Sequence, residues 1–181
     1  MDIYTLLIIV HLIGAALGVG GATFVEIFLT KSLMDGVIDP TESSFLKITY
    51  RVVRIGLVLS LFTGFGFVVL YIAEGQSFKL YNPVLWAKLT VVSIIAVNAI
   101  LLQMHKISLW LGSALSFVSW YGALIIGVFL TNATRLSYIE IILFYIIGVI
   151  IGGFILDAVR KKFGAFGRRA SDKPALNSPK P

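Results

Sequence analysis

The chain consists of five apolar runs, each of about 20 residues or more, separated by short polar stretches. A run of that length crosses a bilayer core of about 30 Å as a helix. The runs are too long and alternate too little to be strands of a membrane barrel, and backbone groups in lipid need partners within their own segment. The pattern therefore predicts an all-α polytopic bundle of about five transmembrane helices within residues 1–165.

Capping residues set the limits of the predicted helices. The first helix is expected over about residues 3–33. Asp39 and Pro40, followed by Glu42, form a start signal for the second, which runs to about residue 73. Three more helices are expected over about residues 83–106, 109–130 and 138–162. Gly, Ser, Pro and Lys then become frequent, so residues 166–181 are predicted to form a disordered basic tail.

Composition excludes several classes of protein. Hydrophobic residues make up 58% of the chain and charged residues 13%, whereas a soluble domain carries about 25% charged residues. The net charge is +6, but Lys and Arg lie between and after the apolar runs, which indicates membrane orientation and not nucleic-acid binding. The chain has no Cys, so disulfides, thiol catalysis, Fe–S clusters and thiolate metal sites are excluded.

The distribution of basic residues predicts the orientation. One side of the predicted bundle has several, namely Lys31, Lys47, Arg51, Arg54 and Lys106, together with the basic tail. The opposite connections hold only Lys79 and Arg135. Because short cytoplasmic loops are enriched in Lys and Arg, we expect the N-terminus outside and the C-terminus in the cytoplasm. The expected location is a bacterial inner membrane.

His11 is the first candidate for chemistry, because ionisable groups are rare within membrane spans. It lies about 12 Å into the first helix. Gly14, Ala15, Gly18 and Ala22 follow at helical spacing, so this face carries little bulk. One interpretation is a small-residue interface in which His11 hydrogen-bonds a neighbouring helix. The other is a haem face with His11 as ligand of the iron.

Lys88 is predicted at nearly the same depth as His11, just after Trp86. It is either a snorkelling lysine beside an interfacial Trp, or a propionate partner, a proton donor or an iron ligand. His105 lies about 25 Å farther along the same helix, so it does not share an iron with His11 and is interpreted as interfacial. Asn98, in mid-span, is expected to make an inter-helix hydrogen bond, with a water-mediated role near a cofactor as the alternative.

Charged residues near the first connection suggest an ion pair. Glu26 of the first helix lies opposite Arg51 and Arg54 of the second in an antiparallel hairpin, so pairing between them is the preferred interpretation. Alternatively an arginine binds a carboxylate such as a haem propionate, to which a guanidinium fork is well suited. Asp157 is expected to pair with Arg160 at the end of the fifth helix.

Several of these residues together resemble the HemJ family of small membrane proteins, which are protoporphyrinogen IX oxidases related to CopD-type copper-resistance proteins. The resemblance covers residues 4–105 and rests on His11, Arg51 or Arg54, Trp86, Lys88 and Leu89. It implies a b-type haem with His11 as a ligand and Lys88 as a residue important for activity. Asn98 and Ala99 stand where that family often has a Tyr-His pair.

Three functional hypotheses follow. The leading one is a membrane protein that binds b-type haem or a related tetrapyrrole through His11, with Lys88 nearby, and serves electron transfer or porphyrin oxidation. Its partners would be a porphyrin substrate or redox protein within an oligomer or larger membrane complex. The second is a non-enzymatic scaffold or accessory subunit that docks partner helices through Gly-rich faces. The third, a CopD-type metal transporter, is less favoured because soft ligands are scarce, with no Cys and three Met.

Overall fold

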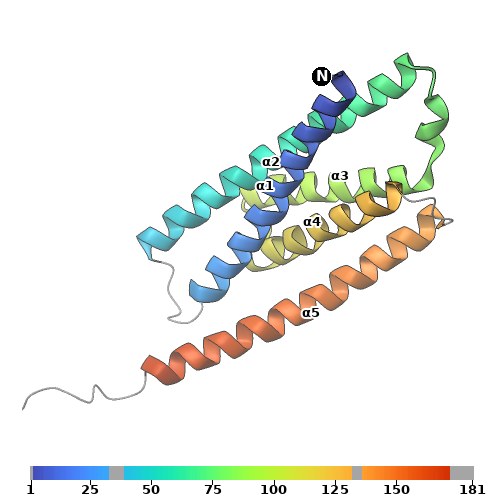
Figure 1. Ribbon diagram of the computed structural model, residues 1–181. Coiled ribbons are helices and arrows are strands. Elements are labelled where there is room, and N and C mark those ends of the chain that lie inside the picture. Colours follow the sequence, from blue (N-terminus) through green and yellow to red (C-terminus); the bar gives the residue numbers. More distant parts are fainter. Residues whose placement is uncertain (1, 33–38, 132–135, 172–181) are drawn as a thin grey trace, which may run out of the picture.

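The computed structural model describes residues 2–32, 39–131 and 136–171, and over these it is helical (Figure 1). The long helices are α1 (Ile3–Ser32), α2 (Pro40–Ala73), α3 (Pro83–Gln103), α4 (Leu109–Thr131) and α5 (Tyr138–Ser171), and a 3-10 helix, η1 (Ser77–Tyr81), joins α2 to α3. All five are long and apolar enough to cross a membrane, which confirms the predicted polytopic bundle.

The capping residues begin the helices where the sequence predicts. At the start of α2 the Asp39 carboxylate accepts a hydrogen bond from the Glu42 backbone N–H (2.7 Å), and the Glu42 carboxylate accepts one from the Asp39 backbone N–H (3.3 Å). The Asn82 side chain caps α3 through the Val84 N–H (2.9 Å). His105 adopts a positive φ of 54° in the turn after α3, so it is an exposed turn residue.

The end of α5 corrects one prediction. This helix continues to Ser171, so residues 166–171, which were expected to be a disordered tail, are helical. The basic residues that follow the apolar run continue the helical backbone without an interruption. The remainder of the predicted tail, residues 172–181, lies outside the described residues.

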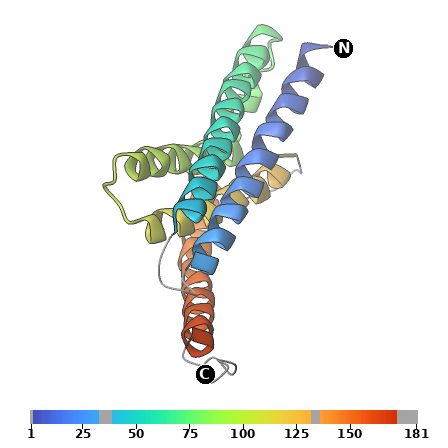
Figure 2. The ribbon, with the colours of Figure 1, turned by 90° about the vertical axis from the view of Figure 1, so that its left-hand side faces the viewer.

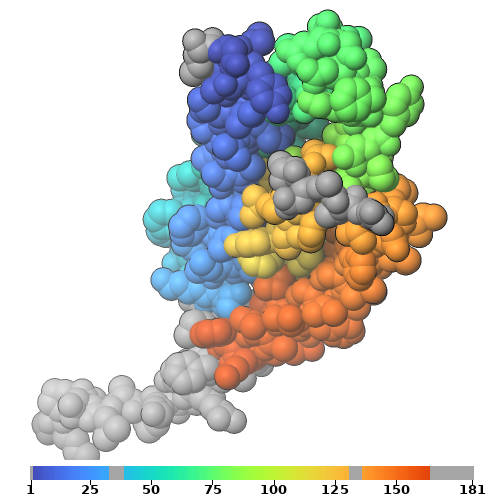
Figure 3. Space-filling model, turned by 45° about the vertical axis from the view of Figure 1, so that its right-hand side comes forward, coloured from blue at the N-terminus to red at the C-terminus, as the bar shows by residue number. Residues whose placement is uncertain are grey.

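The helices form two hairpins and an outlying fifth helix. Helices α1 and α2 run side by side over most of their length, while α3 crosses this hairpin steeply (Figure 2). Helix α4 packs against α1, α3 and α5 and so lies at the centre of the bundle. In the space-filling view α5 extends along one side, as the orange to red surface (Figure 3). Most of its apolar side chains are exposed, as expected for a surface that faces lipid.

A glycine seam brings α1 and α2 into backbone contact. A Cβ added at Gly56 of α2 would lie 2.7 Å from the Gly14 carbonyl oxygen and 2.7 Å from the Gly18 nitrogen of α1. At the next level of the bundle the Trp120 ring of α4 lies directly against Gly18. This close approach of small residues is the usual packing of membrane helices, and it fixes how α1 faces α2.

Candidate functional site

Three polar side chains from three helices meet within the bundle, and we call them the His11–Lys88 site: His11 of α1, Thr63 of α2 and Lys88 of α3. His11 Nδ1 lies 2.8 Å from Thr63 Oγ1, and His11 Nε2 lies 3.3 Å from Lys88 Nζ. The edge of the Phe67 ring packs against the imidazole, with ring centroids 5.8 Å apart. The structure therefore brings together the two ionisable residues that the sequence places at one depth.

The hydrogen bonds of Thr63 determine the protonation of His11. Thr63 Oγ1 donates its only hydrogen to the Leu59 carbonyl oxygen (2.7 Å), so it acts as the acceptor toward the imidazole. His11 Nδ1 must then carry a hydrogen and donate it. Lys88 Nζ has only hydrogens to offer and donates to Nε2. His11 is therefore a neutral imidazole whose Nε2 lone pair faces Lys88.

Among the described residues, Lys88 has no compensating negative charge nearby. Its side chain is half-buried, and its Nζ approaches α4, where a Cβ added at Gly127 would lie 3.4 Å from that nitrogen. In residues 2–32, 39–131 and 136–171 the ion pairs are those of Glu26 and Asp157, and neither involves Lys88. A cation within a membrane span is costly without a negatively charged partner. Lys88 is therefore the strongest candidate of these residues for binding an anionic ligand.

The small-residue face beside His11 is occupied by protein. Gly14 lies against Ser60 and Gly56, and Gly18 lies under Trp120. Ala22 is also buried in the core, whereas Ala15 is partly exposed. The face thus forms the helix interface of the first interpretation, and a flat ligand at His11 would have to approach from another side.

Two other predicted residues of α3 lie apart from His11. Trp86 is 55% exposed, and its indole N–H donates to the Leu80 carbonyl oxygen (2.8 Å). Asn98 is buried and donates from Nδ2 to the Gly112 carbonyl oxygen of α4 (2.8 Å), which is the expected inter-helix hydrogen bond. Asn98 lies about 15 Å along α3 from Lys88, because ten residues separate them.

The arginines of α2 do not reach the His11–Lys88 site. Arg54 precedes Thr63 by nine residues, which is about 13 Å along the axis and about 2.5 turns, so the two residues face opposite sides of the helix. Arg51 lies one turn farther away, and both arginines are exposed. Arg54 Nη1 instead donates to Gln103 Oε1 (3.1 Å) at the end of α3.

The predicted pairing of Glu26 with Arg51 or Arg54 is wrong, because the partner of Glu26 is Arg160 of α5. Arg160 Nε and Nη2 donate to the two carboxylate oxygens, each at 2.6 Å. Arg160 also donates to the Trp110 carbonyl oxygen (2.9 Å) and to Ser113 Oγ (2.8 Å) of α4. We call these four residues the Glu26–Arg160 cluster. The expected pairing of Asp157 with Arg160 is likewise wrong, since Asp157 pairs with Lys161 (2.6 Å).

Sequence reasoning missed Thr63, although it had one usable signal. A hydroxyl residue about halfway along an apolar run often bonds either its own helix or a neighbouring one, and Thr63 does both. Metal-ligating side chains are sparse elsewhere, and the described part of the chain contains no group of three His, Cys, Asp or Glu residues placed to hold an ion.

Comparison with protein-family models, with curated proteins and with solved structures gives no match to this chain. The resemblance to HemJ proteins therefore stays a prediction, and the geometry of the His11–Lys88 site is the main basis for a functional conclusion.

Proposed function

We propose that the protein binds b-type haem, or a related tetrapyrrole, at the His11–Lys88 site and serves electron transfer or HemJ-like protoporphyrinogen oxidation. One observation carries this proposal: a neutral imidazole directs its Nε2 lone pair at an ammonium group for which the described residues supply no carboxylate. That site offers a ligand atom for iron and a positive charge for an acidic substituent of the macrocycle.

The donor chemistry of the site suits this group. Thr63 accepts from Nδ1 and holds the imidazole in the tautomer that leaves Nε2 as the ligand atom. Lys88 now lies at Nε2 and would turn aside on its flexible stem, where its ammonium group would bind an anionic group such as a propionate. Bound haem would supply one-electron redox chemistry. Gly14 and Gly18 would keep their packing role and would not contact the macrocycle.

Lys88 is the proposed catalytic residue, because it holds a proton at Nζ beside the position that a macrocycle bound at His11 would occupy. The Lys88 side chain is half-buried, next to the core residues Ala87 and Val91. A proton released or taken up near the macrocycle would therefore pass through Lys88. In the expected orientation the site lies in the outer half of a bacterial inner membrane, where a porphyrin substrate or a redox partner would reach it.

A second function is favoured by a different feature of the same site. Both imidazole nitrogens already have partners within the chain, so His11 also satisfies the requirements of a purely structural residue. The protein would then be a non-enzymatic scaffold or accessory subunit. Its open glycines, such as Gly64 and Gly148, where an added Cβ would meet nothing within 4 Å, would face partner helices.

An optical spectrum distinguishes the two functions. Protein purified in mild detergent from haem-replete cells is measured oxidised and after dithionite reduction, beside His11→Ala and the control His105→Ala. Haem binding predicts a Soret band and reduced α and β bands that are absent in His11→Ala and unchanged in His105→Ala, since His105 lies in an exposed turn. A well-folded, colourless wild-type protein would contradict haem binding and favour the scaffold.

A further inference from the structure

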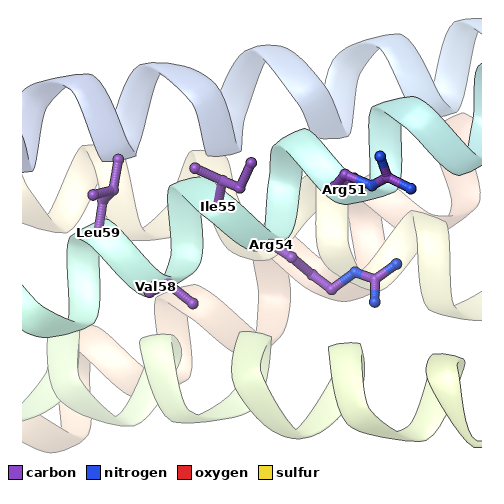
Figure 4. A pocket seen from close by; sticks show the side chains of 5 residues that line it. All are labelled: Arg51, Arg54, Ile55, Val58 and Leu59. Carbon is purple, nitrogen blue, oxygen red and sulfur yellow. The ribbon is translucent and has the colours of Figure 1, made fainter.

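A shallow hollow of about 400 Å³ lies on the surface of α2, away from the His11–Lys88 site (Figure 4). Its lining forms two rows at a spacing of four residues, Arg51–Ile55–Leu59 and Arg54–Val58. Figure 4 shows both guanidinium groups at one end and the three apolar side chains at the other. The hollow is therefore amphipathic along the helix axis.

The position of this hollow relative to the membrane follows from α2 itself. Residues 55–73 contain no Asp, Glu, Lys or Arg, and a segment of about this length spans the hydrocarbon core. Arg51 and Arg54 directly precede this segment, so they lie at the membrane interface at the level of lipid headgroups. The apolar end of the hollow lies in the hydrocarbon region, where acyl chains begin.

The two arginines retain unused hydrogen-bonding capacity. Within the described residues, Arg51 makes no hydrogen bond or ion pair, and Arg54 pairs with no carboxylate. Arg54 donates from Nε to the Tyr50 carbonyl oxygen (3.3 Å) and from Nη1 to Gln103 Oε1 (3.1 Å), and neither bond uses its Nη2. Both side chains are exposed. Two adjacent guanidinium groups of this kind are complementary to a phosphate.

We propose that this hollow binds an anionic phospholipid. The lipid phosphate contacts Arg51 and Arg54, and the upper part of one acyl chain lies over Ile55, Val58 and Leu59. Basic sites beside transmembrane helices recognise anionic headgroups in this way. The lipid site is independent of the haem proposal, because Arg54 faces the side of α2 opposite to Thr63 and lies about 13 Å from it along the axis.

Native mass spectrometry in mild detergent tests this site, with phosphatidylglycerol as the anionic lipid and phosphatidylcholine as the neutral one. We expect phosphatidylglycerol to be retained in preference to phosphatidylcholine. Arg51→Gln and Arg54→Gln should each weaken its binding about fivefold, and the double variant about thirtyfold. Lys106→Gln, which removes one exposed charge beyond the end of α3, is the matched control and should change binding less than twofold.

Three outcomes would overturn the proposal. The first is equal retention of both lipids. The second is displacement of phosphatidylglycerol by excess inorganic phosphate, which would make the site one for a free anion. The third is loss of haem absorbance in Arg51→Gln, which would assign the arginines to a haem carboxylate. Arg54→Gln removes two hydrogen bonds and could impair folding. The test would then rest on Arg51→Gln, which breaks no hydrogen bond or ion pair among the described residues, and on Arg54→Lys, which keeps the positive charge.

Discussion

Two polar clusters lie at different levels of the same bundle, and they differ in charge balance. In the Glu26–Arg160 cluster a guanidinium meets a carboxylate through two bonds of 2.6 Å and a carbonyl and a hydroxyl from α4. Four of the five N–H donors of Arg160 are thereby used. In the His11–Lys88 site an ammonium meets a neutral imidazole, and the described residues add no negative charge.

We use this difference in charge balance to distinguish a structural cluster from a functional one. A cluster whose charges balance is complete within the protein, and this one ties α5 to α1 and α4. The His11–Lys88 site carries a positive charge that no described carboxylate balances, so it is incomplete by the same criterion. Natural membrane proteins retain such groups mainly where a ligand or a proton uses them, so the incomplete cluster is where we place the function.

The largest expected effect comes from removing one partner of the Glu26–Arg160 cluster. Arg160→Met leaves the Glu26 carboxylate buried without a counterion and should lower the free energy of unfolding by about 3–5 kcal/mol. Thermal unfolding in detergent measures this loss. The control is Lys161→Met, which breaks a pair whose lysine side chain is 77% exposed and should cost less than about 1 kcal/mol. Equal effects of the two variants would show that the cluster has no special structural role.

The second effect tests whether the glycine seam positions the His11–Lys88 site. Gly56→Ala places a methyl group against backbone atoms of α1, which do not move aside as a side chain would, so we expect a loss of about 1–3 kcal/mol. The His11–Thr63 hydrogen bond should weaken as α1 and α2 separate. Gly64→Ala on the same helix meets nothing within 4 Å and should be neutral or slightly stabilising. A neutral Gly56→Ala would contradict the seam.

The third expected effect is a gain in stability, whereas the first two are losses. Lys88→Met removes a half-buried cation that has no counterion among the described residues, so stability should rise by about 1.5 kcal/mol, while haem content falls. Unfolding and haem content are measured on the same preparation. If Lys88→Met instead unfolds the protein as readily as Arg160→Met does, the two clusters are both structural and the comparison fails.

The smallest effect sharpens the role of Thr63. Thr63→Val removes the acceptor for His11 Nδ1–H at nearly constant volume, and we expect a loss of stability of about 1 kcal/mol because His11 is only partly buried. The haem reduction potential should shift, because the loss of the Nδ1–H acceptor lowers the basicity of the imidazole and removes a constraint on its orientation. Thr49→Val is the matched control. The Thr49 hydroxyl donates only to the Phe45 carbonyl oxygen of its own helix among the described residues, so its removal should leave the haem reduction potential unchanged. Identical potentials in both variants would exclude an orienting role for Thr63.

The sequence predicted the features that depend on one helix at a time. Spans follow from the length of apolar runs, and starts follow from caps such as Asp39 with Glu42. The meeting of His11 and Lys88 was suggested by their equal depth, which is also a property of each helix alone.

The side of each helix that faces the core could not be predicted from the sequence. Where every face of a helix is apolar, the pattern does not say which side faces the core. For this reason Arg51 and Arg54 were predicted as partners of Glu26. In the structure Arg54 donates to Gln103, and Glu26 pairs with Arg160, which is distant in sequence. Thr63 was missed for the same reason.

The most direct test of the account is the haem content per folded chain of His11→Ala, measured together with its thermal stability. Because we propose His11 as a haem ligand and it lies outside the main core, we expect the variant to bind no haem while it unfolds within about 1.5 kcal/mol of the unliganded wild type. A His11→Ala protein that retains the haem content of the wild type, or a folded wild type that contains none, would contradict the proposed site.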